Sequence, residues 1–145
     1  MNASKHLKVL FFLTLLTLCL PWFTYNAKVM GYRNGFAFLK WFLLPMLTLT
    51  ISLFYPARNT AVIILGELAQ LANFAVLACA PGLWQQVCNI KPGFWWSEGI
   101  RTAQPGFWIS CCFFLLLFMN FQIELFKDSG SVLQQERKDD PGEKL

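Results

Sequence analysis

Residues 60–80, TAVIILGELAQLANFAVLACA, form an apolar run that contains a single carboxylate, Glu67. A helix rises about 1.5 Å per residue, so a helix of this length spans the roughly 30 Å hydrocarbon core of a bilayer. Gln70 and Asn73 follow Glu67 at three-residue steps, and polar side chains therefore recur along the run. An ionisable group is costly in hydrocarbon. We therefore expect Glu67 to find hydrogen-bonding partners on neighbouring helices.

The composition of the 145-residue chain is typical of an integral membrane protein, with 56% hydrophobic and 14% charged residues. Its net charge of +4 is scattered, whereas a nucleic-acid interface needs a clustered basic face. His6 is the only histidine and precedes the first apolar segment, which excludes multi-histidine metal sites and any histidine-based triad within the membrane spans. No GxSxG, Walker A, HExxH or dinucleotide motif is present. We expect no enzyme, no metal, no cofactor and no nucleic-acid partner.

Polar turns divide the chain into apolar segments that predict transmembrane spans at about residues 9–25, 36–55, 60–80 and 107–126. The first segment ends in Pro21-Trp22-Phe23 without a small-x-small cleavage site, so we expect a retained helix with an aromatic anchor. The short link at residues 56–59 makes the second and third helices antiparallel neighbours. The sequence predicts an all-α integral membrane domain over residues 1–126, a bundle of four antiparallel transmembrane helices with both termini on one side. A disordered polar tail is expected at residues 127–145.

The distribution of Lys and Arg suggests the direction of insertion. With the N-terminus inside, the inner side carries seven basic residues and the outer side five. The inner residues are Lys5, Lys8, Arg58, Lys127, Arg137, Lys138 and Lys144, and the outer residues are Lys28, Arg33, Lys40, Lys91 and Arg101. By the positive-inside rule this small excess places both termini in the cytoplasm. Which membrane holds the protein does not follow from the sequence.

A polar layer is expected at the depth of Glu67, which lies about seven residues, or roughly 10 Å, from the inner end of its helix. The other spans carry hydrogen-bonding groups at similar depths. The expected members are Glu67, Gln70, Thr14, Thr50 and Asn120. Two interpretations remain open. The layer is either a set of polar contacts that fixes helix register, or a proton- or cation-handling site with Glu67 as its coupling group.

The loop after the third span contains a repeated tetrapeptide, Pro-Gly-apolar-Trp, which begins at Pro81, Pro92 and Pro105. Pro-Gly is the central pair of a type II turn, and tryptophan favours the headgroup level of a bilayer. We therefore expect a loop that returns repeatedly to the membrane interface. Its tryptophans would anchor it or bind a partner; they are Trp84, Trp95, Trp96 and Trp108.

Five cysteines fall in the outer half of the predicted membrane domain or just beyond it: Cys19, Cys79, Cys88, Cys111 and Cys112. Cys79 and Cys88 could close a structural disulfide, whereas the adjacent Cys111 and Cys112 point in different directions. The function expected first is a non-enzymatic interaction, scaffold or assembly role with lipids, other membrane proteins or further copies of the chain. The alternative is a small transporter or ion-conducting oligomer that uses Glu67. A membrane thiol oxidoreductase comes third, because no CxxC pair is present.

Overall fold

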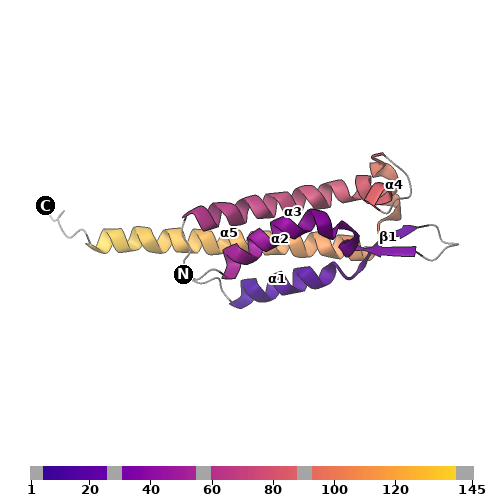
Figure 1. The fold of residues 1–145 in the computed structure, drawn as a ribbon. Helices are drawn as coiled ribbons and strands as arrows, with labels where there is room; N and C mark the ends of the chain where they lie inside the picture. Colours follow the sequence, from indigo (N-terminus) through magenta and orange to yellow (C-terminus); the bar gives the residue numbers. More distant parts are fainter. Residues whose placement is uncertain (1–4, 26–30, 55–59, 88–92, 140–145) are drawn as a thin grey trace.

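The computed structural model describes residues 5–25, 31–54, 60–87 and 93–139, and this part of the chain is mostly helical. The elements in chain order are α1 (Lys5–Thr17), β1 (Pro21–Tyr25), β2 (Gly31–Asn34), the 3-10 helix η1 (Gly35–Phe38), α2 (Leu39–Phe54), α3 (Thr60–Val87), α4 (Trp96–Thr102) and α5 (Pro105–Asp139). Helices α1, α2, α3 and α5 run along a common axis (Figure 1). The antiparallel strands and α4 lie at one end of this axis, here called the strand end. The first residues of α1 and the last of α5 lie toward the other, the terminal end.

Within the described residues, three helical segments are long and apolar enough to cross a membrane: Gly35–Phe54, Thr60–Val87 and Pro105–Lys127. Their outward faces carry large exposed apolar side chains, for example Leu44, Leu68 and Leu115. Apolar side chains that cover the outside of a helix assembly suit contact with lipid and not with water. The expectation of a largely helical membrane protein is supported to this extent.

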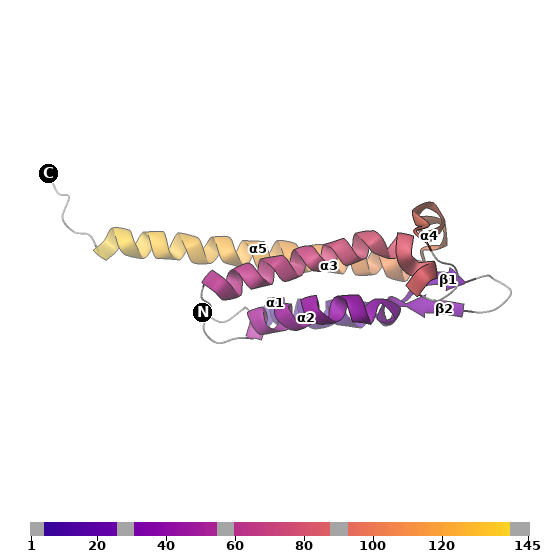
Figure 2. The same ribbon diagram turned by 45° about the horizontal axis from the view of Figure 1, so that its top comes forward.

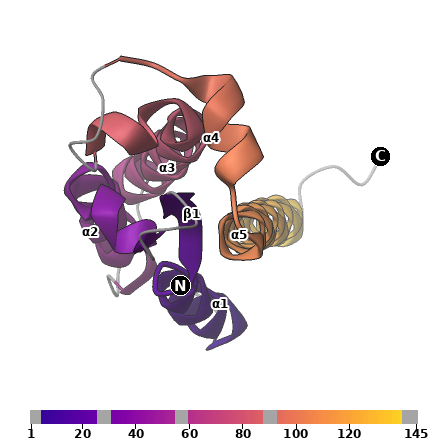
Figure 3. The same cartoon turned by 90° about the vertical axis from the view of Figure 1, so that its right-hand side faces the viewer.

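The helices pack as two extensive pairs, α1 with α5 and α2 with α3, whereas α3 and α5 meet over a smaller area. Figure 2 shows α3 beside α5, with α1 and α2 below them. A view along the axis places the same helices around β1 (Figure 3). The seam between α3 and α5 is therefore packed less closely than either of these two pairs.

The first apolar segment differs from the expected helix over residues 9–25. Helix α1 has only 13 residues and ends at Thr17, which gives it a length of about 20 Å. The chain then turns, and Pro21 begins strand β1. Proline has no N–H and disfavours helical geometry in the residue before it, which explains the early end of the helix. Trp22 and Phe23 were expected as interface anchors and are instead completely buried.

The second half of the chain is more helical than the sequence suggested. Helix α3 continues through Pro81 and Gly82 to Val87, and membrane helices tolerate such an internal proline. Pro105 opens α5 at the first helical position, which proline favours. The expected turns at these two Pro-Gly pairs were therefore wrong, and among the described glycines only Gly93 has a left-handed φ, of 118°. Helix α5 also continues to Asp139, into the tail that was expected to be disordered, where good helix formers dominate.

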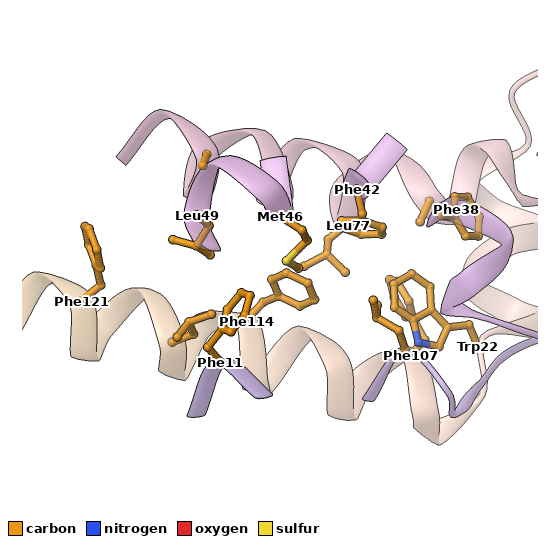
Figure 4. Packing of buried hydrophobic residues seen from close by; sticks show 14 of the residues in the cluster. Phe11, Trp22, Phe38, Phe42, Met46, Leu49, Leu77, Phe107, Phe114 and Phe121 are labelled. Carbon is orange, nitrogen blue, oxygen red and sulfur yellow. The ribbon is translucent and has the colours of Figure 1, made fainter. Parts of the chain in front are cut away.

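An aromatic cluster fills the strand end between the helices (Figure 4). The ring of Trp22 stacks on Phe38 at 5.8 Å between centroids and meets the edge of Phe107 at 5.5 Å. Phe23 stacks on Trp84 at 5.7 Å. The indole N–H of Trp22 donates to Ser110 Oγ at 2.9 Å, which joins β1 to α5. Rings and hydrogen bonds together close this end of the bundle.

Gly66 marks a close approach of α3 to both α2 and α5. A Cβ at this position would overlap Ser52 Oγ on α2 and lie 2.7 Å from Phe121 Cζ on α5. We predict that Gly66→Leu lowers the free energy of unfolding by about 1–3 kcal/mol, because overpacking forces the helices apart. Ala61→Leu is the control, since Ala61 is exposed on the same helix. The measurement is the unfolding midpoint in mild detergent titrated with SDS; equal midpoints for the two variants would contradict the close approach.

Candidate functional site

Glu67 is hydrogen-bonded to Gln122, across the seam between α3 and α5. Gln122 Nε2 donates to both carboxylate oxygens, at 2.6 and 2.7 Å. A hydrogen bond to a carboxylate is shorter and stronger than one between neutral groups. Glu67 is only half-buried and lies in the half of α3 nearer the terminal end. The carboxylate thus joins two helices that otherwise meet over a small area.

Asn120 was the residue of the fourth span expected at the depth of Glu67, but it lies on the wrong face of α5 for that role. It is exposed, and its Nδ2 donates to the carbonyl of Leu116 on its own helix at 2.8 Å. Residues two apart on a helix of 3.6 residues per turn are separated by about 200°. Gln122 therefore faces α3 when Asn120 faces away from it. Counting residues from the helix ends gave the approximate depth of the partner of Glu67 on α5, but not which residue it is.

The threonines of the expected layer are satisfied by backbone carbonyls. Thr14 Oγ1 donates to Leu10 O at 2.8 Å and approaches Phe113 O of α5 at 3.5 Å. Thr50 Oγ1 donates to Met46 O at 2.7 Å. Threonine hydroxyls commonly bond to carbonyls of the preceding helical turn. In the described part of the chain, the hydrogen bonds of Glu67 go to Gln122 and not to a ring of threonines.

Gln70 and Asn73 are the most unusual polar residues of the structure. Both side chains are 0% exposed, and none of their amide oxygens and nitrogens has a hydrogen-bond partner among the described residues. Because they are three residues apart, they are neighbours on one face of α3, and Glu67 lies one turn further toward the terminal end. A buried polar group without a partner costs about 1–3 kcal/mol. Such a group calls for an explanation, either a bound partner or a function.

A lateral apolar groove opens between α3 and α5 at the strand end. Its volume is about 280 Å³. We call it the α4 groove, lined by Phe74, Leu77, Ala78 and Pro81 of α3, Trp96 and Ile100 of α4, and Phe107, Trp108 and Cys111 of α5. The lining is almost entirely apolar, which suits a hydrocarbon guest.

Helix α4 is held over the groove by three contacts with α3. The indole N–H of Trp96 donates to Ala78 O at 3.0 Å, and Gln85 Nε2 donates to Glu98 Oε2 at 2.7 Å. Gly99 packs directly on the Pro81 carbonyl, so closely that a Cβ would overlap it. The edge of the groove formed by α4, here called its upper edge, therefore has a defined position.

The tryptophans expected on one loop surface separate into two groups. Trp84 is 3% exposed and stacks on Phe23, so it belongs to the core. Trp95 is half-buried, and its backbone N–H donates to Gly82 O at 2.8 Å. Trp96 and Trp108 are 50% and 48% exposed, and both line the α4 groove. These two stay predictions for interface or partner-binding residues.

The cysteines do not form a described reactive pair. Cys19, Cys79 and Cys112 are exposed, and Cys111 is half-buried in the wall of the α4 groove. Cys88 lies outside the described residues, as does any disulfide between it and Cys79. Within the described ranges, no three His, Cys, Asp or Glu side chains are grouped so that they could hold a metal ion.

Two chemically different regions therefore lie along α3. The half toward the terminal end carries the Glu67–Gln122 pair and the unpartnered amides of Gln70 and Asn73. The half toward the strand end borders the apolar α4 groove.

No protein-family model matches the chain, and searches of curated proteins and of solved structures found no match.

Proposed function

We propose that the protein is a four-span integral membrane protein that associates with lipids or other membrane proteins and does not act by catalysis. In this proposal α1 is the fourth crossing, because it packs along α5, which is long enough to span. The basic residues near the helix ends favour a cytoplasmic location for both termini, with the strand end outside. The short α1 is completed by the turn and by β1, whose buried aromatic rings pack among the other helices.

The observation that carries this proposal is the α4 groove, an apolar hollow with a fixed upper edge on a surface suited to lipid contact. Its test is a photo-crosslinking amino acid placed at Trp108, with the exposed Leu47 of α2 as the control position. In native membranes we expect one dominant adduct from position 108 and a diffuse set from position 47. The same diffuse set from both positions would contradict association through the groove.

Glu67→Gln separates an association role from ion coupling. The substituted amide keeps an acceptor for Gln122 Nε2 and loses the charge, so we expect the helices to stay joined and recovery of partners from native membranes to be unchanged. Glu67→Leu is the contrast, because it leaves the Gln122 amide without its partner. The measurements are co-purification in mild detergent and pH-driven flux in liposomes. Intact co-purification together with loss of a wild-type flux would contradict the association role.

A second function, the transport of protons or small cations, is favoured by the unpartnered amides of Gln70 and Asn73. They lie three and six residues beyond Glu67 on α3, each step turned by about 60° around the helix axis, so the three polar side chains follow one another in a winding file. If this function holds, Asn73→Leu should abolish a pH-driven flux in liposomes that the wild-type protein supports. A wild-type flux equal to that of protein-free liposomes would exclude it.

A further inference from the structure

We propose that the α4 groove binds one acyl chain of a phospholipid, and that Arg101 holds the phosphate of the same lipid. This inference rests on the proposed membrane association and names the partner class for one surface. It joins the apolar lining of the groove to the charge of Arg101, which follows the lining residue Ile100 on α4.

The length and position of the groove match a single leaflet. Along α3 it runs from Pro81 to Phe74, which is about 10 Å of helix at 1.5 Å per residue. That distance is less than half of a hydrocarbon core of roughly 30 Å. Trp96 and Trp108 stand near the strand end of the groove, and tryptophan favours the level of the headgroups. The groove therefore begins where the acyl chains of that leaflet begin.

The size of the groove selects a slender guest. A transmembrane helix with its side chains is about 10–12 Å across and does not fit inside it. A protein cavity of about 150 Å³ accommodates benzene, and the groove has about 280 Å³. Its lining offers almost no polar surface, so a hydrocarbon chain fills it without leaving a hydrogen-bonding group unpaired.

Arg101 supplies a charge for the headgroup. It is exposed on α4, directly after Ile100, which lines the groove. The nearest acidic residue on this helix, Glu98, accepts a hydrogen bond from Gln85, and Arg101 forms no ion pair within the described part of the chain. A guanidinium binds phosphate through two parallel hydrogen bonds. The acyl chain of a phospholipid fills the groove while its phosphate binds the guanidinium. A second copy of this chain would bring only side chains to the groove.

The test uses the purified full chain in phosphatidylcholine liposomes that contain a phosphatidylglycerol with a diazirine in its acyl chain. After illumination, mass spectrometry maps the adducts. We expect them to concentrate on Phe74, Ala78 and Cys111 and to be fewer on Leu65 and Leu116, which are exposed outside the groove. Ala78→Trp fills the groove and should lower this labelling about tenfold, a difference of about 1.4 kcal/mol in binding.

Two controls make the result specific. Ala61→Trp places the same ring on an exposed site near the other end of α3 and should leave the labelling unchanged. A diazirine-labelled diacylglycerol carries the chains without the phosphate. Arg101→Gln should reduce phospholipid labelling to the diacylglycerol level, whereas Lys40→Gln, which removes an exposed charge from α2, should not.

Even labelling of all lipid-facing residues, with no effect of Ala78→Trp, would overturn the proposal in favour of ordinary bilayer lipid. A dominant adduct to a second copy of the chain, obtained with the photo-crosslinking amino acid at position 108, would overturn it in favour of self-association. Ala78→Leu gives the same test with a smaller side chain if the tryptophan variant does not fold, as judged from its unfolding midpoint. Co-purification from native membranes tests the proposed function separately. A negative lipid-labelling result therefore contradicts the lipid site alone and does not contradict the association role.

Discussion

Trp22→Ala should lower the free energy of unfolding by about 3–5 kcal/mol, the usual cost of deleting a large aromatic side chain from a core. Trp22 is 0% exposed, and its ring touches Phe38, Phe42 and Phe107, which come from three different elements. Figure 4 shows Trp22 beside Phe107 and Phe38 in the part of the core toward the strand end. Removal of this one side chain therefore leaves a cavity where η1, α2, α5 and β1 meet.

The measurement is the unfolding midpoint of the purified protein in mild detergent titrated with SDS, followed by circular dichroism. Trp41→Ala is the matched control, because Trp41 is 50% exposed on the outside of α2 and should change the midpoint little. Ser110→Ala isolates the hydrogen bond from the indole N–H, with an expected loss of about 0.5–1.5 kcal/mol. A Trp22→Ala effect no larger than that of Trp41→Ala would show that the aromatic cluster does not stabilise the strand end.

The three described helices that are long and apolar enough to cross a membrane could be predicted from the sequence, because length and apolarity are local properties of a segment. The burial of Trp22 could not be predicted from the sequence in this way. It depends on contacts far along the chain: Gly35, where a Cβ would lie 2.7 Å from the indole, and Ser110 on α5. A tryptophan at the end of an apolar run has the same local pattern whether it faces lipid or the core.

The candidate site was predicted in part for a related reason. Glu67 and Gln70 stood out because polar groups are rare in apolar runs, and the structure places Gln70 in the interior. To identify the partner of Glu67, one must know which face of α5 points toward α3. Counting residues along the helix gives only depth, so Asn120 was predicted instead of Gln122. Only tertiary contacts reveal the α4 groove. It exists because Gly99 lets α4 pack against the Pro81 carbonyl.

Gln70→Met together with Asn73→Leu should raise the free energy of unfolding by about 1–3 kcal/mol for each replaced amide. Both amides are fully buried without a hydrogen-bond partner in the described part of the chain, and an apolar group of similar shape removes the cost of their desolvation. Methionine is close to glutamine in size, whereas leucine shares the branching of asparagine but is larger, so overpacking offsets part of the gain at position 73. The gain should appear as a higher SDS midpoint in the same assay.

Gln122→Met is the matched control, since it makes the same chemical change at a glutamine whose amide is bonded to Glu67. It removes the donor of a carboxylate, so we expect the opposite sign, a loss of about 1.5–3 kcal/mol. A loss of stability in Gln70→Met as well would mean that its amide has a bound partner in the membrane. If the double variant is more stable but loses a wild-type flux or co-purification, the amides are retained for function at the expense of stability, as proteins often do at binding sites.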